Sequence, residues 1–261
     1  MIETTQQSGS LIPPQQTSFT IPPFDQLTMM IFAKPGAGKT RFLAGSPNTL
    51  FMATEPGQQF TKATVVDITG WAKFAGVVKE LADMKKAGQL PYTSVVIDIV
   101  DNLNTMCRDW VCGQKGLAYP SEKDFGKTWA ECNRTWTTWL GSLMRITNVR
   151  FVTHCSSELT EVQNDAGINE EIERFIPTFS GNRAAQYLDG VVNAMGFITQ
   201  AKSGQRIITF NPSPRVAAKD RTDILAKLGV IPLPENPDDG FKLVGDLYAK
   251  KAHELGFKLS E

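Results

Sequence analysis

The residues with the clearest capacity for chemistry lie in the segment AKPGAGKT, residues 33–40. Glycines followed by a lysine and a hydroxyl side chain are typical of a P-loop, in which backbone N–H groups at a helix N-terminus surround phosphates. Lys39 would reach the β- and γ-phosphates, and the Thr40 hydroxyl would bind Mg²⁺. The residues expected to hold the nucleotide are Pro35, Gly36, Ala37, Gly38, Lys39, Thr40 and Arg41. The pattern therefore predicts ATP and Mg²⁺ as cofactors.

Ala33 stands where this motif has its first glycine. That position closes the loop after the preceding strand, and a single methyl group fits there if φ stays negative. An apolar strand is expected before the loop and a helix after it, which is the context that the motif requires. A second GKT, at residues 126–128, has no strand before it, and we interpret it as a chance match. We therefore expect the phosphate site at residues 33–40.

Two further carboxylates follow expected strands. Asp98 ends the apolar run SVVID, where a carboxylate can hold Mg²⁺ through water, so Thr40 and Asp98 are the predicted metal-site residues. Glu55 follows another strand at the carboxyl edge, which is where open α/β sheets bind ligands, and it could position water. The alternative for Glu55 is a solvated turn. We interpret the nearby Asp101 as the N-cap of the next helix.

Short apolar runs alternate with helical patterns through most of the chain. Strands are expected at residues 28–32, 49–53, 64–68, 93–97, 149–153, 191–198 and 206–210. Helices are expected at residues 39–44, 71–87, 102–115, 127–146 and 184–188. Continuous apolar strands suit a sheet covered on both faces, and alternation with helices favours parallel pairing. The predicted fold is α/β, with a mainly parallel central sheet covered by helices.

The two ends of the chain differ from the middle. Residues 1–23 are rich in Gln, Ser, Thr and Pro, which predicts a flexible arm. Residues 24–225 would form the core. Residues 226–261 contain PLPENPDDG and then a probable helix at 241–255, and we expect them to form a C-terminal appendage.

The composition is ordinary for a globular protein, with 41% hydrophobic residues and a net charge of zero over 261 residues. A neutral chain binds nucleic acid only through a local patch. No apolar run approaches the roughly 20 residues that span a bilayer, and the N-terminal residues lack signal-peptide features, so we expect a cytoplasmic protein without a membrane partner. The four cysteines, Cys107, Cys112, Cys132 and Cys155, are expected to be buried or incidental thiols.

Taken in order, AKPGAGKT, ATEPG, SVVIDIVDNL, VRFVTH and VAAKDR resemble the RecA-type P-loop ATPases. Within that group the chain is most similar to the phage AAA/RecA-like proteins of single-strand annealing and recombination. The resemblance covers about residues 20–225. It implies a RecA-like fold, ATP hydrolysis, self-association into a ring or filament, and single-stranded DNA as a partner. A single-strand-binding protein is a further expected partner.

The resemblance also implies roles for individual residues. Glu55 would activate the attacking water, and His154 would sense the γ-phosphate, although a core histidine is the alternative. Lys219 and Arg221, in AAKDR, would be offered to the nucleotide of a neighbouring subunit, since side chains two apart on an extended segment point the same way. A solvated charge cluster is the alternative there. The expected catalytic residues are Glu55, Lys39, His154, Lys219 and Arg221. Arg183 is a weaker candidate for phosphate sensing.

The segment that corresponds to the second DNA-binding loop of RecA is acidic here. It carries Glu158, Glu161, Asp165, Glu170, Glu171 and Glu173 against Arg174, around a predicted hairpin turn at residues 164–167. Because DNA binding needs positive charge, this hairpin is a poor candidate for the DNA backbone. The better candidates are Arg108, Lys115, Lys123 and Lys127, interleaved with Trp110, Tyr119, Phe125 and Trp129, which could stack bases. The alternative is that the aromatics are core and the lysines solvated.

These features together predict an ATP-hydrolysing, oligomeric protein that binds single-stranded DNA during annealing, recombination or repair. A hexameric helicase-like or DNA-packaging motor is one alternative, because it would share the ATP site. A nucleotide-switched interaction protein with little hydrolysis is another, and its acidic hairpin would bind a protein partner.

Overall fold

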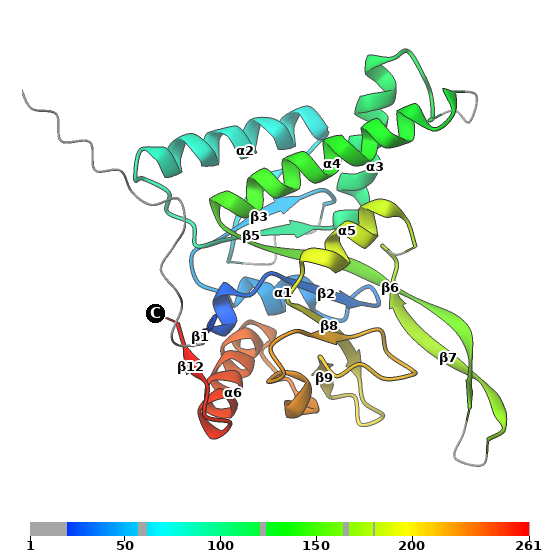
Figure 1. Ribbon diagram of the computed structural model, residues 1–261. Helices are drawn as coiled ribbons and strands as arrows, with labels where there is room; N and C mark the ends of the chain where they lie inside the picture. The colour runs from blue at the N-terminus through cyan, green and yellow to red at the C-terminus, as the bar shows by residue number, and fades with distance from the viewer. Residues whose placement is uncertain (1–19, 57–61, 121–123, 164–166, 180, 261) are drawn as a thin grey trace, which may run out of the picture.

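A computed structural model describes residues 20–56, 62–120, 124–163, 167–179 and 181–260 (Figure 1). The strands of its main sheet are β2 (Met29–Ala33), β3 (Thr49–Ala53), β4 (Thr64–Asp67), β5 (Ser94–Asp98), β6 (Asn148–Gln163), β7 (Asn169–Pro177), β8 (Ala194–Gln200), β9 (Arg206–Thr209), β10 (Lys219–Asp220) and β11 (Val230–Pro232). They are ordered β11-β9-β8-β2-β6-β5-β3-β4, while β10 pairs with β8 and β7 with β6.

The strands from β8 to β4 in this order are all parallel. Every residue of β2, β3 and β5 is buried, as expected for strands covered on both faces. The predicted α/β fold with a mainly parallel sheet is therefore confirmed. Because the strands are parallel, their carboxyl ends meet at one edge, and β6 lies between β2 and β5 there.

Helices cover the two faces of the sheet separately. One face carries α2 (Trp71–Lys86), α3 (Val100–Gln114), α4 (Lys127–Ile146) and α5 (Arg183–Val191), which lie together in Figure 1. Trp136 of α4 is central to this layer, since its ring stacks on Trp71 and its indole N–H donates to the Ala184 carbonyl at 3.3 Å. The other face carries α1 (Lys39–Ala44) and α6 (Gly240–Glu254).

The C-terminal segment, expected as an appendage, packs into this second face. Strand β11 joins the sheet beside β9, and α6 buries Phe241 and Tyr248 against it. The Tyr248 hydroxyl donates to the Pro22 carbonyl at 3.0 Å, and β12 (Lys258–Leu259) pairs with β1 (Thr20–Ile21). The last residues of the expected N-terminal arm are therefore held by the C-terminal segment, while residues 1–19 lie outside the described part.

The predicted hairpin is a continuation of the central strand β6. Strands β6 and β7 pair antiparallel from Cys155 opposite Pro177 to Gln163 opposite Asn169, and the hairpin projects away from the body (Figure 1). Residues 164–166 of the predicted turn lie outside the described part. None of the described helices has the length and apolar composition needed to cross a membrane.

Candidate functional site

The segment predicted to bind phosphate joins β2 to α1 at the carboxyl edge of the sheet. Gly36 and Gly38 have φ values of 77° and 95°, in the left-handed region that favours glycine. Ala33 instead has the extended conformation of β2 and is fully buried. An alanine is compatible with the first position of this loop because the chain is still a strand there.

Lys39 lies under the loop, with only 6% of its surface exposed. Its Nζ donates to the carbonyls of Ala33 and Lys34 at 3.1 and 3.3 Å and lies 3.4 Å from Nδ1 of His154. Burial lowers the pKa of Lys39, while the charges of Asp98 and Glu55 act in the opposite direction. The ammonium is therefore desolvated beside the loop, where a phosphate would be a strong acceptor.

Thr40 and Asp98 are brought together as predicted for a metal site. The Thr40 hydroxyl donates to a carboxylate oxygen of Asp98 at 2.6 Å, and Asp98 is 2% exposed. A hydroxyl and a carboxylate are the hard oxygen ligands that Mg²⁺ takes, so the donor set fits the ion. Within the described residues, no three Asp, Glu, His or Cys side chains gather as a metal site. The remaining ligands of Mg²⁺ would therefore be phosphates and water.

Thr54 fixes the ends of β3 and β5 to each other, a contact that was not predicted from the sequence. Its hydroxyl donates to the Ile99 carbonyl, its Oγ1 accepts from the Ile99 N–H, and both distances are 2.8 Å. The Thr54 N–H also donates to the Asp98 carbonyl. Glu55, the next residue, is thereby held at the same edge as Asp98 and Lys39. In the sequence, Thr54 is recognisable only as a polar residue directly before Glu55.

His154 and Thr153 end the sheet portion of β6 between the loop and Asp98. The Thr153 hydroxyl donates to the Asp101 carboxylate at 2.6 Å and accepts from the Phe179 N–H at 3.3 Å. The prediction that Asp101 is a helix N-cap is wrong, because α3 begins two residues earlier than expected and Ile99 is its N-cap residue. Asp101 instead ties α3 to β6.

Arg206 is a second cation beside the loop and was not predicted. It lies on β9, and a Cβ placed on Gly38 would come within 3.0 Å of its Nη1. Its Nη2 donates to the Glu235 carbonyl at 2.6 Å. No local sequence pattern indicates this contact, because it depends on β9 lying near the loop in space. Arg41, predicted to bind nucleotide, directs its side chain to Asp238 and Asn236 of the C-terminal segment.

Lys219 and Arg221 are not brought to this site within one chain. Lys219 pairs with Met195 near the amino end of β8, whereas the loop follows the carboxyl end of the neighbouring β2. Its Nζ donates to the carbonyl of Asp189 and lies 3.2 Å from the carboxylate of the same residue. Arg221 is exposed. Arg183 is the first residue of α5 and is also exposed.

Two comparisons with known proteins bear on this arrangement. A search of curated proteins found no match to the chain. A family model described as AAA domain matches residues 25–222, which covers the loop, Glu55, Asp98 and His154 and more than half of the chain. The chain therefore belongs to the AAA-domain family of P-loop ATPases.

Proposed function

We propose that this protein hydrolyses ATP at the γ-phosphate with Mg²⁺ and couples the reaction to single-stranded DNA, acting as an oligomer in annealing, recombination or repair. The observation that carries the hydrolytic part is the 2.6 Å hydrogen bond from Thr40 to Asp98 beside the buried Lys39. It supports the proposal because the oxygens that would bind the metal lie close to the cation that would bind phosphate.

Each residue of the site has a defined task in this proposal. The backbone N–H groups of residues 36–40 and the Lys39 ammonium would hold the phosphates and stabilise charge that develops on the γ-phosphate. Thr40 and Asp98 would hold Mg²⁺, which when bound neutralises phosphate charge. Glu55 would orient the attacking water. Nδ1 of His154 lies 3.4 Å from Nζ of Lys39, and this side chain would sense the γ-phosphate.

The position of the expected arginine finger supports the oligomeric part of the proposal. Arg221 and Lys219 lie beside the amino end of β8. They could therefore reach a phosphate only in the site of a neighbouring subunit. Lys39→Ala subunits mixed with Arg221→Ala subunits test this step. Each variant alone should be inactive and the mixture should recover turnover at sites that join an intact loop to an intact finger, whereas no recovery in mixed assemblies would contradict a finger supplied in trans.

One observation favours the second candidate, a nucleotide-switched interaction protein. Glu161 lies directly opposite Glu171 in the β6–β7 hairpin, and like charges in such a pair are unfavourable. Leu159 and Ile168 of the same hairpin are 68% and 61% exposed. An acidic surface with exposed apolar side chains fits a basic protein partner better than DNA.

Steady-state ATP turnover with and without single-stranded DNA tests the proposal. Wild-type protein should hydrolyse ATP faster with DNA, and Lys39→Ala should abolish turnover. Lys86→Ala changes an exposed lysine on α2 and serves as the control. ATP binding without turnover under either condition would support the interaction protein instead. Displacement of a paired strand would favour the helicase-like motor over annealing.

A further inference from the structure

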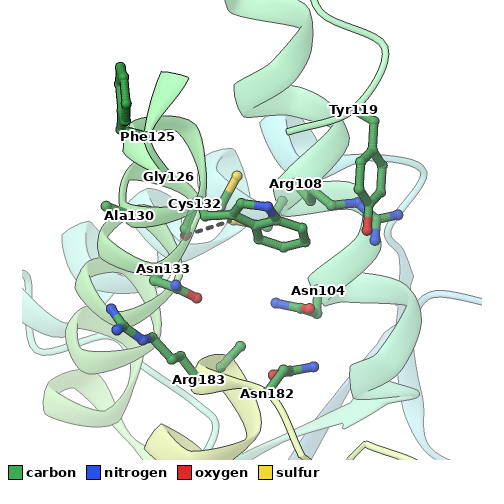
Figure 2. A pocket seen from close by; sticks show the side chains of 13 residues that line it. Asn104, Arg108, Tyr119, Phe125, Gly126, Ala130, Cys132, Asn133, Asn182 and Arg183 are labelled. Carbon is green, nitrogen blue, oxygen red and sulfur yellow. Dashed lines mark hydrogen bonds between the residues drawn. The ribbon is translucent and has the colours of Figure 1, made fainter. Parts of the chain in front are cut away.

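Apart from the nucleotide site, the protein has a cavity between α3, α4 and the start of α5, with a volume of about 740 Å³ (Figure 2). This volume is in the range of sites that hold a small organic group. No residue of the phosphate-binding loop lines it. Trp110, which was also expected to stack bases, does not line it either, and Lys123 lies outside the described residues.

We propose that this cavity binds one unpaired base of single-stranded DNA together with its adjoining backbone phosphate. The inference rests on the proposed coupling to single-stranded DNA and assigns that partner to a specific site. Three features of the lining carry it: exposed aromatic rings, side-chain amides and two guanidinium groups.

The aromatic rings are placed to stack on a base. Trp129 and Tyr119 are 38% and 54% exposed and contact each other edge to face at 5.5 Å between ring centroids. Arg108 lies over the Tyr119 ring at 5.0 Å. Phe125 is 94% exposed at the rim, with a φ of 56° that is unfavourable for a bulky residue. A strained backbone that presents an aromatic ring to solvent indicates a contact outside the chain.

Side-chain amides provide the polar groups that a base edge requires. Figure 2 shows the amides of Asn104 and Asn133 pointing toward one another across the cavity. The Asn182 oxygen accepts from the Ala185 N–H at 2.8 Å as the N-cap of α5, which leaves its NH₂ group as a donor. Amides offer both donors and acceptors, and base edges present both. The lining is therefore suited to a base whose edge is not occupied by pairing.

The charge of the lining suits a phosphate. Arg108 and Arg183 line the cavity, and among the described residues no Asp or Glu does so. Glu131 pairs with Lys115 at 2.6 Å, and one oxygen of Asp124 accepts from Thr128 while its other oxygen has no hydrogen-bond partner within the described part of the chain. Asp109 lies 3.4 Å from Arg108 and is 61% exposed, which makes it a weak competitor for the guanidinium. Two guanidinium groups at one cavity supply the local positive charge that a neutral chain needs to bind a phosphate.

Affinity of the full chain for a labelled oligothymidylate, measured by fluorescence anisotropy, tests the assignment. Trp129→Ala should weaken binding by about tenfold, the scale of losing one stacked base, and Trp129→Phe should restore most of it. Arg183→Gln should weaken binding and reduce its dependence on salt. Trp110→Ala is the matched control, because Trp110 is 40% exposed on the same helical hairpin but outside the cavity. Circular dichroism and the urea unfolding midpoint of each variant verify that it is folded.

The outcomes separate this inference from the proposed function. If wild-type protein binds the strand and neither Trp129→Ala nor Arg183→Gln changes the affinity, the cavity assignment is overturned and the function stands. If wild-type protein binds no strand, the DNA part of the function fails as well. Quenching of tryptophan fluorescence by thymidine monophosphate as strong as that by the strand would assign the cavity to free nucleotides and overturn the inference.

Discussion

The Thr40 hydroxyl donates a 2.6 Å hydrogen bond to the Asp98 carboxylate across the end of β6, the strand that separates β2 from β5. The two residues are far apart in the sequence and meet only because parallel strands share one carboxyl edge. Asp98→Asn keeps a hydrogen-bond acceptor for Thr40 but removes the charge that would attract Mg²⁺. We expect turnover to fall by about 100-fold, the scale of removing one preorganised electrostatic group from an active site.

Magnesium titrations of turnover and of ATP binding measure this effect. Metal-free ATP binding should be nearly unchanged in Asp98→Asn, whereas the Mg²⁺ concentration for half-maximal turnover should rise. Thr40→Ser keeps the hydroxyl and is the matched control for Thr40→Val, which removes it. Equal turnover in Asp98→Asn and wild-type protein would show that this carboxylate does not serve the metal.

Arg206 should contribute to nucleotide binding, although no motif in the sequence contains this residue. Its guanidinium lies against Gly38, so Arg206→Ala removes a cation from the edge of the phosphate site. We expect KM for ATP to rise by about tenfold with a smaller change in kcat, because a charge that contacts bound nucleotide stabilises the ground state as well. Arg206→Lys should recover part of the loss.

Steady-state kinetics at saturating Mg²⁺ separate the KM and kcat effects of Arg206→Ala. Lys202→Ala is the control, because Lys202 is an exposed cation in the β8–β9 connection, shortly before Arg206 in the sequence. A loss of kcat at unchanged KM would assign Arg206 to the transition state instead.

The Asp101 carboxylate should make stability depend on pH. Burial raises its pKa, and the hydrogen bond from Thr153 opposes this. A carboxyl with a raised pKa in the folded state stabilises the fold below its unfolded pKa, and this contribution is lost as pH rises through the folded pKa. Asp101→Asn should therefore be more stable than wild type at neutral pH, with the difference closing toward acid pH.

Urea unfolding across that pH range measures the difference between Asp101→Asn and wild type. Asp109→Asn changes an exposed carboxylate on the same helix and should give a nearly constant offset. If the free energies of unfolding of Asp101→Asn and wild type changed in parallel with pH, the raised pKa of the Asp101 carboxyl would be contradicted.

The Thr153 hydroxyl hydrogen-bonds residues near both proposed sites, and we expect it to couple them. It donates to Asp101, one turn before Asn104 on α3, and accepts from Phe179, which leads to Asn182. The adjacent His154 lies 3.4 Å from Lys39. Thr153→Val removes both hydrogen bonds at similar volume, so we expect stimulation of turnover by single-stranded DNA to fall toward unity, which corresponds to loss of the coupling free energy between the sites.

The ratio of turnover with and without DNA is the measurement for Thr153→Val, and basal turnover is recorded beside it. Thr153→Ser retains the hydroxyl and should retain the stimulation. A Thr153→Val protein whose stimulation equals that of wild type would exclude this hydroxyl as the connection between the sites.

The sequence predicted the elements well because local patterns determine them, and α1, β3 and α4 begin and end where expected. It also predicted that Thr40 and Asp98 share a metal site, because the loop and the carboxylate each follow an expected strand and parallel strands end at one edge. It did not predict Thr54, Arg206 or Asp101 in their observed roles, because these contacts join segments whose spatial proximity no local pattern encodes. The C-terminal segment was expected to form an appendage, and its packing was not predicted for a related reason, since its apolar face becomes core only after folding against α1 and β9.

Phe241 provides the test of that C-terminal packing. Its ring lies 4.8 Å from the ring of Phe24 and 5.7 Å from that of Phe42, and the guanidinium of the buried Arg150 lies 4.7 Å above it. Phe241→Ala would leave a cavity at the junction of the N-terminal segment, α1 and α6. We expect the free energy of unfolding to fall by about 3–4 kcal/mol, as for other large-to-small changes of buried aromatic residues.

Denaturant unfolding of the full chain measures the loss in Phe241→Ala. Val230→Ala is the control, because Val230 lies in the same C-terminal segment but is 59% exposed, and it should change stability little. If residues 226–261 were a separate appendage, Phe241→Ala would leave the main unfolding transition unchanged and melt only the C-terminal helix. A single transition shifted to lower denaturant is the expected result, because α6 shares one hydrophobic cluster with the strands that carry the nucleotide site.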